Sequence, residues 1–194
     1  MNGPAPAGTY SRSDMTLPSE AFETERLRLQ PISFDDKEAF WRMRSSPEVM
    51  RFIPVDVATD KDELFREIEA DFAKGERFKF FFAVFWKNPD ADQSSEMIGL
   101  EIMRPLEDGT GMEIGYWFLT EVWGQGVATE ATRAVAQYCP PLMGFPRQHI
   151  MASVAVGNTG SRRVLEKTGL DVRYIYKENG ADVWYLEMAD PARD

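Results

Sequence analysis

The sequence predicts an α+β domain in which strands follow one another along the chain and helices are inserted between them. Residues 78–86 and 112–119 are aromatic and β-branched runs, the composition of buried strands. Before and after these runs, apolar residues recur at intervals of three and four, the spacing that places them on one face of a helix. Asn179-Gly180 lies between two strand-like runs and is the strongest short hairpin signal.

The length and composition favour one domain with an N-terminal tail. The chain has 194 residues, enough to bury a sizeable core without a disulfide or a metal. Residues 1–20 are rich in Pro, Gly, Ala and Ser, with almost nothing to bury. We therefore predict a flexible tail over residues 1–20 and a single domain over residues 21–190.

The charge and the scarcity of certain residue types exclude several function classes. A net charge of −10 argues against general nucleic-acid binding and favours cationic partners. Cys139 and His149 are single residues of their kinds, so an internal disulfide is excluded and a protein-built zinc site is not expected. No apolar run reaches the ~18 residues that a membrane helix needs. We expect a cytoplasmic protein that binds neither nucleic acid, membrane nor metal.

The first third of the domain reads as a strand followed by helices. Residues 26–30 alternate charged and apolar side chains, which predicts a strand. Ser33, with Asp36 three residues later, predicts the capped start of a helix. Pro47 stands at the first position of a short second helix. Residues 59–74 carry apolar side chains at helical spacing and predict a third.

The middle and the end of the chain supply the remaining strands. Residues 97–103 predict a strand between the two runs already named, and a helix stripe then extends to Pro140-Pro141, which should end it. Residues 149–156 predict another strand, and residues 158–167 a helix. Residues 174–188 predict the last hairpin.

A glycine turn marks the candidate ligand site. Gly124-Gln125-Gly126 follows the strand at 112–119, and a helical pattern starts at once. A helix that begins on such a turn presents free backbone N–H groups at its positive end, which favours an anion such as phosphate. The turn lacks the Gly-Lys-Ser/Thr of a nucleotide-binding P-loop, and it lacks the third glycine of a dinucleotide fingerprint.

Two further groups of residues are candidates for chemistry. Asn158 stands where a helix cap is expected, and its amide could equally face a cleft. Ser161 follows one turn later. Glu101 and Glu113 are glutamates within apolar strands, where a carboxylate either points to water or lines a polar groove.

Three separated segments resemble the GNAT superfamily, and most closely its RimJ/RimL-like branch of ribosomal-protein-alanine N-acetyltransferases. They are Thr24-Glu25-Arg26-Leu27-Arg28-Leu29, Trp123-Gly124-Gln125-Gly126-Val127-Ala128-Thr129-Glu130-Ala131, and the Asn158-x-x-Ser161-x-Arg163-Val164-Leu165-Glu166-Lys167-x-Gly169-Leu170 segment. The resemblance covers about residues 22–188, with the segments in the family's order.

The resemblance implies a mixed, mostly antiparallel seven-stranded sheet flanked by helices and splayed between its fourth and fifth strands, with acetyl-CoA in the opening. It implies that the pantetheine arm follows the backbone of Phe118, Leu119 and Thr120, and that Asn158 faces the cofactor. It places the pyrophosphate on the amides of Trp123, Gly124, Gln125, Gly126, Val127, Ala128 and Thr129. Trp123 stands where the wider family has Gln or Arg, which removes one cationic contact.

The resemblance also implies direct transfer of an acetyl group to an amine. A protonated amine cannot attack a thioester, and deprotonation at pH 7 costs about 1.4 kcal/mol for an α-amino group and about 4.6 kcal/mol for a lysine. We expect Glu113 to be the base, with Glu101 as the next candidate, and Ser161 to protonate the departing thiolate. A nucleophile pair of Cys139 and His149 is not expected, because the cysteine falls on a buried helix stripe.

The predicted function is therefore an acetyl-CoA-dependent N-acetyltransferase acting on a primary amine. The sequence leaves open whether the amine is a small molecule or a protein N-terminus, and whether the protein is a monomer or a homodimer. The alternative from another class is a catalytically inactive module that binds CoA or an acyl-CoA.

Overall fold

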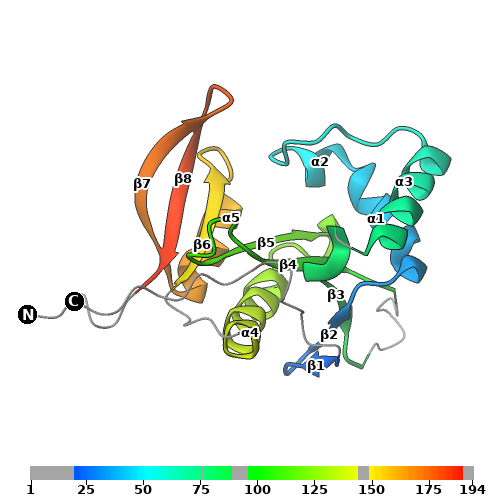
Figure 1. Ribbon diagram of the computed structural model, residues 1–194, viewed down its shortest axis with the longest axis horizontal. Helices are drawn as coiled ribbons and strands as arrows, with labels where there is room; N and C mark the ends of the chain where they lie inside the picture. Colours follow the sequence, from blue (N-terminus) through cyan, green and yellow to red (C-terminus); the bar gives the residue numbers. More distant parts are fainter. Residues whose placement is uncertain (1–19, 76, 89–95, 144–148, 190–194) are drawn as a thin grey trace, which may run out of the picture.

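One mixed sheet organises the computed structural model, which describes residues 20–75, 77–88, 96–143 and 149–189 (Figure 1). Its strand order is β1-β2-β3-β4-β5-β6-β8-β7. The strands are β1 (Phe22–Glu23), β2 (Leu27–Pro31), β3 (Phe81–Trp86), β4 (Gly99–Pro105), β5 (Met112–Phe118), β6 (Ile150–Ala155), β7 (Leu170–Glu178) and β8 (Ala181–Met188). The helices are α1 (Lys37–Arg44), α2 (Pro47–Met50), α3 (Lys61–Lys74), α4 (Val127–Leu142) and α5 (Thr159–Thr168).

The predicted fold class is confirmed, and the strand count is corrected from seven to eight. All neighbouring strands are antiparallel except β5 and β6, which are parallel. The additional strand is β1, which contributes only the pairs Phe22↔Leu29 and Glu23↔Arg28. Two residues are too few to show an alternating pattern in the sequence. The predicted opening between the fourth and fifth strands is thus the opening between β5 and β6.

Local sequence signals account for most helix boundaries. The Ser33 side chain accepts a hydrogen bond from Asp35 N, and the Asp36 carboxylate accepts one from Ser33 N. The predicted capping box is therefore present. Asp60 caps α3 by accepting from Glu63 N. Gly75 ends α3 in the left-handed region with φ 69°.

Several boundaries differ from the sequence-based expectation, and the largest shift is at β7, which begins at Leu170 and not at residue 174. Residues 77–80 form a 3₁₀ turn, so β3 begins at Phe81 and not at residue 78. Pro140 and Pro141 lie inside the last turn of α4, which extends to Leu142. Met143 N still donates to the Cys139 carbonyl at 3.1 Å, so the end of the helix remains hydrogen-bonded. All of the predicted tail except Glu20 lies outside the described residues.

Two apolar clusters lie on opposite faces of the sheet. Figure 1 shows α1–α3 on one side of the sheet and α4 on the other. One cluster joins the sheet to α4 and α5 and includes Phe82, Met103, Ile114, Phe118, Val127, Val135 and Leu165. The other joins it to α1 and α3 and includes Phe40, Met43, Leu64, Ile68, Ala83 and Leu100. Within the described ranges, no helix has the length and apolar character needed to cross a membrane.

Candidate active site

The sheet opens between β5 and β6. Their parallel ladder has only two pairs, Met112↔Ile150 and Glu113↔Met151. Beyond Glu113, β5 runs on to Phe118 while β6 diverges from it (Figure 1). Antiparallel pairing with β4 continues along the whole of β5, so one edge of this strand stays bonded while the other faces the opening. A backbone edge of this kind can pair with an extended ligand that carries amide groups.

The glycine turn lies at the end of the open part of β5. Gly124 has φ 76° and Gly126 has φ 78°, left-handed values that favour glycine at both positions. Gly126 is the N-cap of α4 and makes no side-chain cap hydrogen bond. The first N–H groups of α4 therefore have no intrahelical partner and no capping side chain, the arrangement that binds an anion.

Neighbouring side chains brace the turn. The Trp123 indole N–H donates to the Phe118 carbonyl at 2.9 Å, and the Gln125 side chain donates to the Glu121 carbonyl at 2.7 Å. The Arg26 guanidinium donates to the Gln125 carbonyl at 3.0 Å. The Trp123 residue itself is 51% exposed. Because these bonds use carbonyl acceptors, they leave the amides at the start of α4 available to a ligand.

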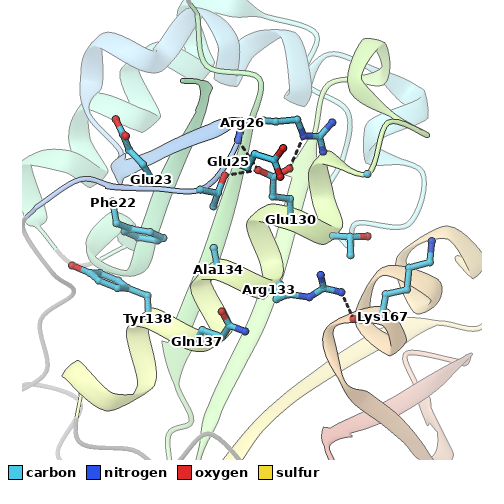
Figure 2. Close-up of a pocket in the computed structure, with 13 residues that line it drawn as sticks. Phe22, Glu23, Glu25, Arg26, Glu130, Arg133, Ala134, Gln137, Tyr138 and Lys167 are labelled. Atoms are coloured by element: carbon cyan, nitrogen blue, oxygen red, sulfur yellow. Dashed lines mark hydrogen bonds and ion pairs between the residues drawn. The ribbon is translucent and has the colours of Figure 1, made fainter. Parts of the chain in front are cut away.

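A surface pocket of about 820 Å³ adjoins the turn along the outer side of α4 (Figure 2). The Arg26 side chain bonds Glu130 at 2.7 Å, and Thr24 adds a second bond to that carboxylate. Partial burial acts to raise the pKa of Glu130, but the bonds from Thr24 and Arg26 outweigh it and hold that pKa below its usual range. Arg133 reaches across the pocket to the carbonyl of Lys167 at 2.7 Å. The pocket lining thus combines the cations Arg26, Arg133 and Lys167 with the carboxylates Glu23, Glu25 and Glu130, beside a helix N-terminus.

Asn158 and Ser161 lie at the start of α5, with the arrangement that the sequence predicted. The Asn158 side-chain oxygen accepts from Ser161 N at 3.1 Å, so Asn158 is the helix cap. This contact occupies its oxygen and leaves its amide N–H groups as donors. The cap alternative is therefore confirmed, and a second contact by the same side chain remains compatible with it.

A tyrosine that the sequence analysis did not select lies against Ser161. The hydroxyl of Tyr116, on β5, is 2.8 Å from Ser161 Oγ and 2.9 Å from the Ser161 carbonyl oxygen. Burial raises the pKa of Tyr116, with a contribution from the charge of Glu101. Alternation along β5 could have assigned Tyr116 to the face of Ile114 and Phe118. Nothing in the local pattern indicated a partner 45 residues away.

The two candidate carboxylates lie on opposite faces of the sheet. Glu113 shares the α1–α3 face with Trp117 and occupies the last paired position before the strands separate. Its Oε2 is 2.7 Å from Arg104 Nε and 2.5 Å from Arg104 Nη2. Glu101 faces α4, is 0% exposed, and accepts from Thr132 Oγ1 at 2.9 Å. Burial raises the pKa of Glu101 well above its usual range.

The face of β5 that carries Glu113 and Trp117, called the open face below, borders empty space at Gly115. Gly115 lies between Glu113 and Trp117 on this face, and a Cβ added to it would meet no atom within 4 Å. Trp117 packs against Phe40 of α1, with ring centroids 5.8 Å apart. The helices α1–α3 therefore wall this space on one side without filling it at Gly115.

The remaining nucleophilic candidates are Cys139 and His149. Cys139 is fully buried on α4, and burial raises the pKa of its thiol. His149 directly precedes β6. Among the described residues, no group of three or more His, Cys, Asp or Glu side chains could hold a metal ion.

The comparisons with known proteins agree with this geometry. The family described as Acetyltransferase (GNAT) domain matches residues 26–171. The uncharacterized N-acetyltransferase YnaD of Bacillus subtilis (strain 168) is 27% identical over 155 residues, covering 80% of this chain and 85% of YnaD. A GNAT-family acetyltransferase from Bacillus anthracis superposes with a TM-score of 0.72 at 24% identity, covering 87% of this chain and 98% of that one.

Two more distant structures share the fold and were solved with CoA. The spermidine N-acetyltransferase from Vibrio cholerae, in complex with CoA and spermine, has a TM-score of 0.67 at 18% identity and covers 85% of this chain and 96% of its own. RimL, a ribosomal L7/L12 α-N-protein acetyltransferase in complex with CoA, has a TM-score of 0.67 at 16% identity. The match covers 87% of this chain and 97% of the RimL chain. On the family match and the shared fold, this chain belongs to the GNAT acetyltransferase family and is an N-acetyltransferase.

Proposed function

We propose that this N-acetyltransferase transfers an acetyl group from acetyl-CoA directly to a primary amine, in the manner of the RimJ/RimL-like branch. The observation that carries the proposal is the opening between β5 and β6, which leads to the uncapped N-terminus of α4. An exposed strand edge followed by free amides matches a ligand that has amide groups and then a pyrophosphate. CoA has both, and two structures with the same fold hold CoA.

The donor side of the proposal uses backbone groups first. The pantetheine arm pairs with the backbone of Phe118, Leu119 and Thr120, and the pyrophosphate accepts from the amides between Trp123 and Thr129. Each such charge-assisted bond contributes about 1.5–3 kcal/mol, so several anchor the donor without a metal. Asn158 contributes its amide N–H groups from the start of α5.

The charged nucleotide end of CoA has a natural place in the adjoining pocket. Arg133 and Lys167 lie side by side in the lining of this pocket, where α4 meets the end of α5 (Figure 2). Although Glu23 and Glu25 also line the pocket, Arg133 and Lys167 beside a helix N-terminus are groups that bind phosphate. We propose that these two cations receive the phosphorylated nucleotide.

Glu113 is the proposed base. It lies at the point where β5 and β6 separate, on the face with open space, so an amine that enters there reaches it directly or through one water. The Arg104 contact holds the carboxylate in place. Glu101 stays the second candidate, although its burial under α4 separates it from the open face.

Ser161 is the proposed proton donor to the departing sulfur. It lies in the first turn of α5, across the opening from β5. The amine nitrogen attacks the thioester carbon, the carbon–sulfur bond breaks with its electrons going to sulfur, and Ser161 Oγ supplies a proton there. A backbone N–H of β5 polarises the thioester carbonyl.

Both acceptor classes, a small-molecule amine and a protein N-terminus, stay within the proposal. The acidic net charge favours encounter with cationic acceptors of either kind. We further propose a single catalytic domain over residues 21–190 preceded by a tail, acting in the cytoplasm as a monomer or homodimer. The lone cysteine is consistent with a reducing compartment.

The decisive experiment measures thiol release from acetyl-CoA with a panel of small amines and N-terminal peptides. The expected result is amine-dependent release, with the acetylated product identified by mass. Tight CoA binding without turnover across the panel would instead support the alternative, an inactive CoA- or acyl-CoA-binding module. A thermal shift with ATP and none with CoA would contradict both.

A further inference from the structure

We propose that Tyr116 is a positioning residue for acetyl transfer, because its phenol hydroxyl orients Ser161 and holds the first turn of α5 against β5. The inference rests on the proposed function, since it places Ser161 beside the leaving sulfur.

The contact joins the two sides of the opening. Tyr116 belongs to β5 and Ser161 to the first turn of α5, which follows β6. The phenol oxygen lies 2.8 Å from Ser161 Oγ and 2.9 Å from the Ser161 carbonyl oxygen. Where β5 and β6 no longer pair, this side-chain contact fixes how far α5 lies from β5. Without this contact, the distance between Ser161 and β5 would depend on the packing of α5 alone.

Counting protons gives the direction of both hydrogen bonds. A carbonyl oxygen can only accept, so the single phenol proton of Tyr116 satisfies the Ser161 carbonyl. The contact with Ser161 Oγ is then satisfied when the serine hydroxyl donates to the phenol oxygen. In this arrangement Ser161 has one defined hydroxyl orientation, and its lone pairs face away from Tyr116.

The same groups can exchange roles during transfer without a net change on Tyr116. As the carbon–sulfur bond breaks, the Ser161 hydroxyl turns to the sulfur and its proton moves there, while a solvent proton moves to Ser161 Oγ in the same step, so no serine alkoxide forms. The Tyr116 hydroxyl turns from the carbonyl to Ser161 Oγ and holds that oxygen in place, and the phenol keeps its own proton throughout.

The fold offers a matched control. Tyr176, on the outermost strand β7, donates its hydroxyl to Ser153 Oγ at 3.1 Å. Tyr176→Phe and Tyr116→Phe each remove one phenol hydroxyl bonded to a serine, and each retains the aromatic ring. Only Tyr116→Phe removes a contact with Ser161, the proposed proton donor.

The test is a double-mutant cycle on the full chain with acetyl-CoA and an amine that the wild type acetylates. We expect Tyr116→Phe to lower kcat about tenfold, the effect of one hydrogen bond, with the KM for acetyl-CoA unchanged. In the Ser161→Ala background, Tyr116→Phe should cause a smaller loss, because that variant has no hydroxyl to orient and only the bond to the carbonyl of residue 161 remains. Tyr176→Phe should leave kcat unchanged.

Several outcomes would overturn the assignment. Equal losses in the two backgrounds would mean that the hydroxyl supports the fold in general, and unchanged kcat would mean that it has no role. A Tyr116→Phe variant that no longer folds would assign the hydroxyl to stability and count against positioning. If the wild type acetylates no amine, the proposed function itself is wrong. That result can be told apart from a failure of the positioning role, because it is obtained with the wild type alone.

Discussion

The two faces of β5 are built in opposite ways. On one face, Tyr116 and Phe118 pack towards α4 and α5, and Tyr116 is hydrogen-bonded to Ser161. On the other face, Glu113 is held by Arg104, and Gly115 leaves open space beside it. A single strand thus separates a packed side from a side with room for a ligand. We name these the bonded face and the open face.

This difference indicates how proteins of one fold can use the same acetyl donor, acetyl-CoA, and accept different amines. The bonded face fixes the donor-side residues through contacts between distant segments, where a substitution disturbs the core. At Gly115 the open face has no neighbour within 4 Å, so a substitution there changes the shape of the acceptor space. We therefore expect changes on the bonded face to affect stability and changes on the open face to affect turnover.

The largest expected effect is at Glu113 on the open face. Glu113→Gln removes the proposed base and retains the size of the side chain, so kcat should fall about 100- to 10,000-fold with little change in CoA affinity. Steady-state kinetics and calorimetric CoA titration measure the two quantities. Glu166→Gln, which disrupts the exposed Arg162–Glu166 pair (2.7 Å), is the control and should keep full turnover. Full activity in Glu113→Gln would exclude Glu113 as the base.

Gly115 tests whether the open face admits the acceptor. Gly115→Val places a branched side chain into space where a Cβ meets nothing within 4 Å. Obstruction of that space should cost about 1–3 kcal/mol, seen as a fall in kcat/KM for the amine. The free energy of unfolding should hold steady or rise, because an interior glycine weakens a strand by about 0.5–1 kcal/mol. Unchanged kcat/KM for every amine would show that the acceptor does not pass Gly115.

Gly99 is the counterpart on the bonded face. It pairs with Phe118 across β4 and β5, and a Cβ added there would overlap the Phe118 ring. Gly99→Ala should therefore lower the free energy of unfolding by about 1–3 kcal/mol, the usual cost of overpacking. Denaturant unfolding measures the difference, with Gly115→Ala as the matched variant. Equal stability of the two alanine variants would remove the contrast between the faces.

Glu101 gives the bonded face a pH dependence. Its folded pKa is raised by burial, so the folded state binds a proton more tightly than the unfolded state does. The contribution of Glu101 to the free energy of unfolding is fully present below its unfolded pKa, about 4.3. It is lost as pH rises towards the pKa of Glu101 in the folded state. Glu101→Gln removes this titration.

The stability of Glu101→Gln relative to wild type should therefore increase with pH above about 4.3. The limiting slope is about 1.4 kcal/mol per pH unit, measured by unfolding at several pH values. A difference that does not change with pH would contradict a protonated Glu101. The same variant separates the two candidate bases: if Glu101→Gln abolishes turnover and Glu113→Gln does not, the base is Glu101.

Elements whose signals are local could be predicted from the sequence. Ser33 with Asp36, Gly75, and Asn179-Gly180 each fixed a boundary, because caps and turns depend on residues a few positions apart. The glycine turn before α4 was predicted for the same reason, since a strand end, left-handed glycines and a helix start are contiguous in the chain. Family resemblance then assigned a ligand to that turn.

Which of these residues meet follows from the three-dimensional arrangement of the elements. It separated Glu101 from Glu113 and paired Glu113 with Arg104 across neighbouring strands. It also brought Tyr116 to Ser161, although 45 residues separate them in the chain. Strand alternation tells which residues share a face, but not what covers that face. Packing over the whole chain determines which element covers each face of a strand. It therefore also determines that one face of β5 is bonded and the other is open.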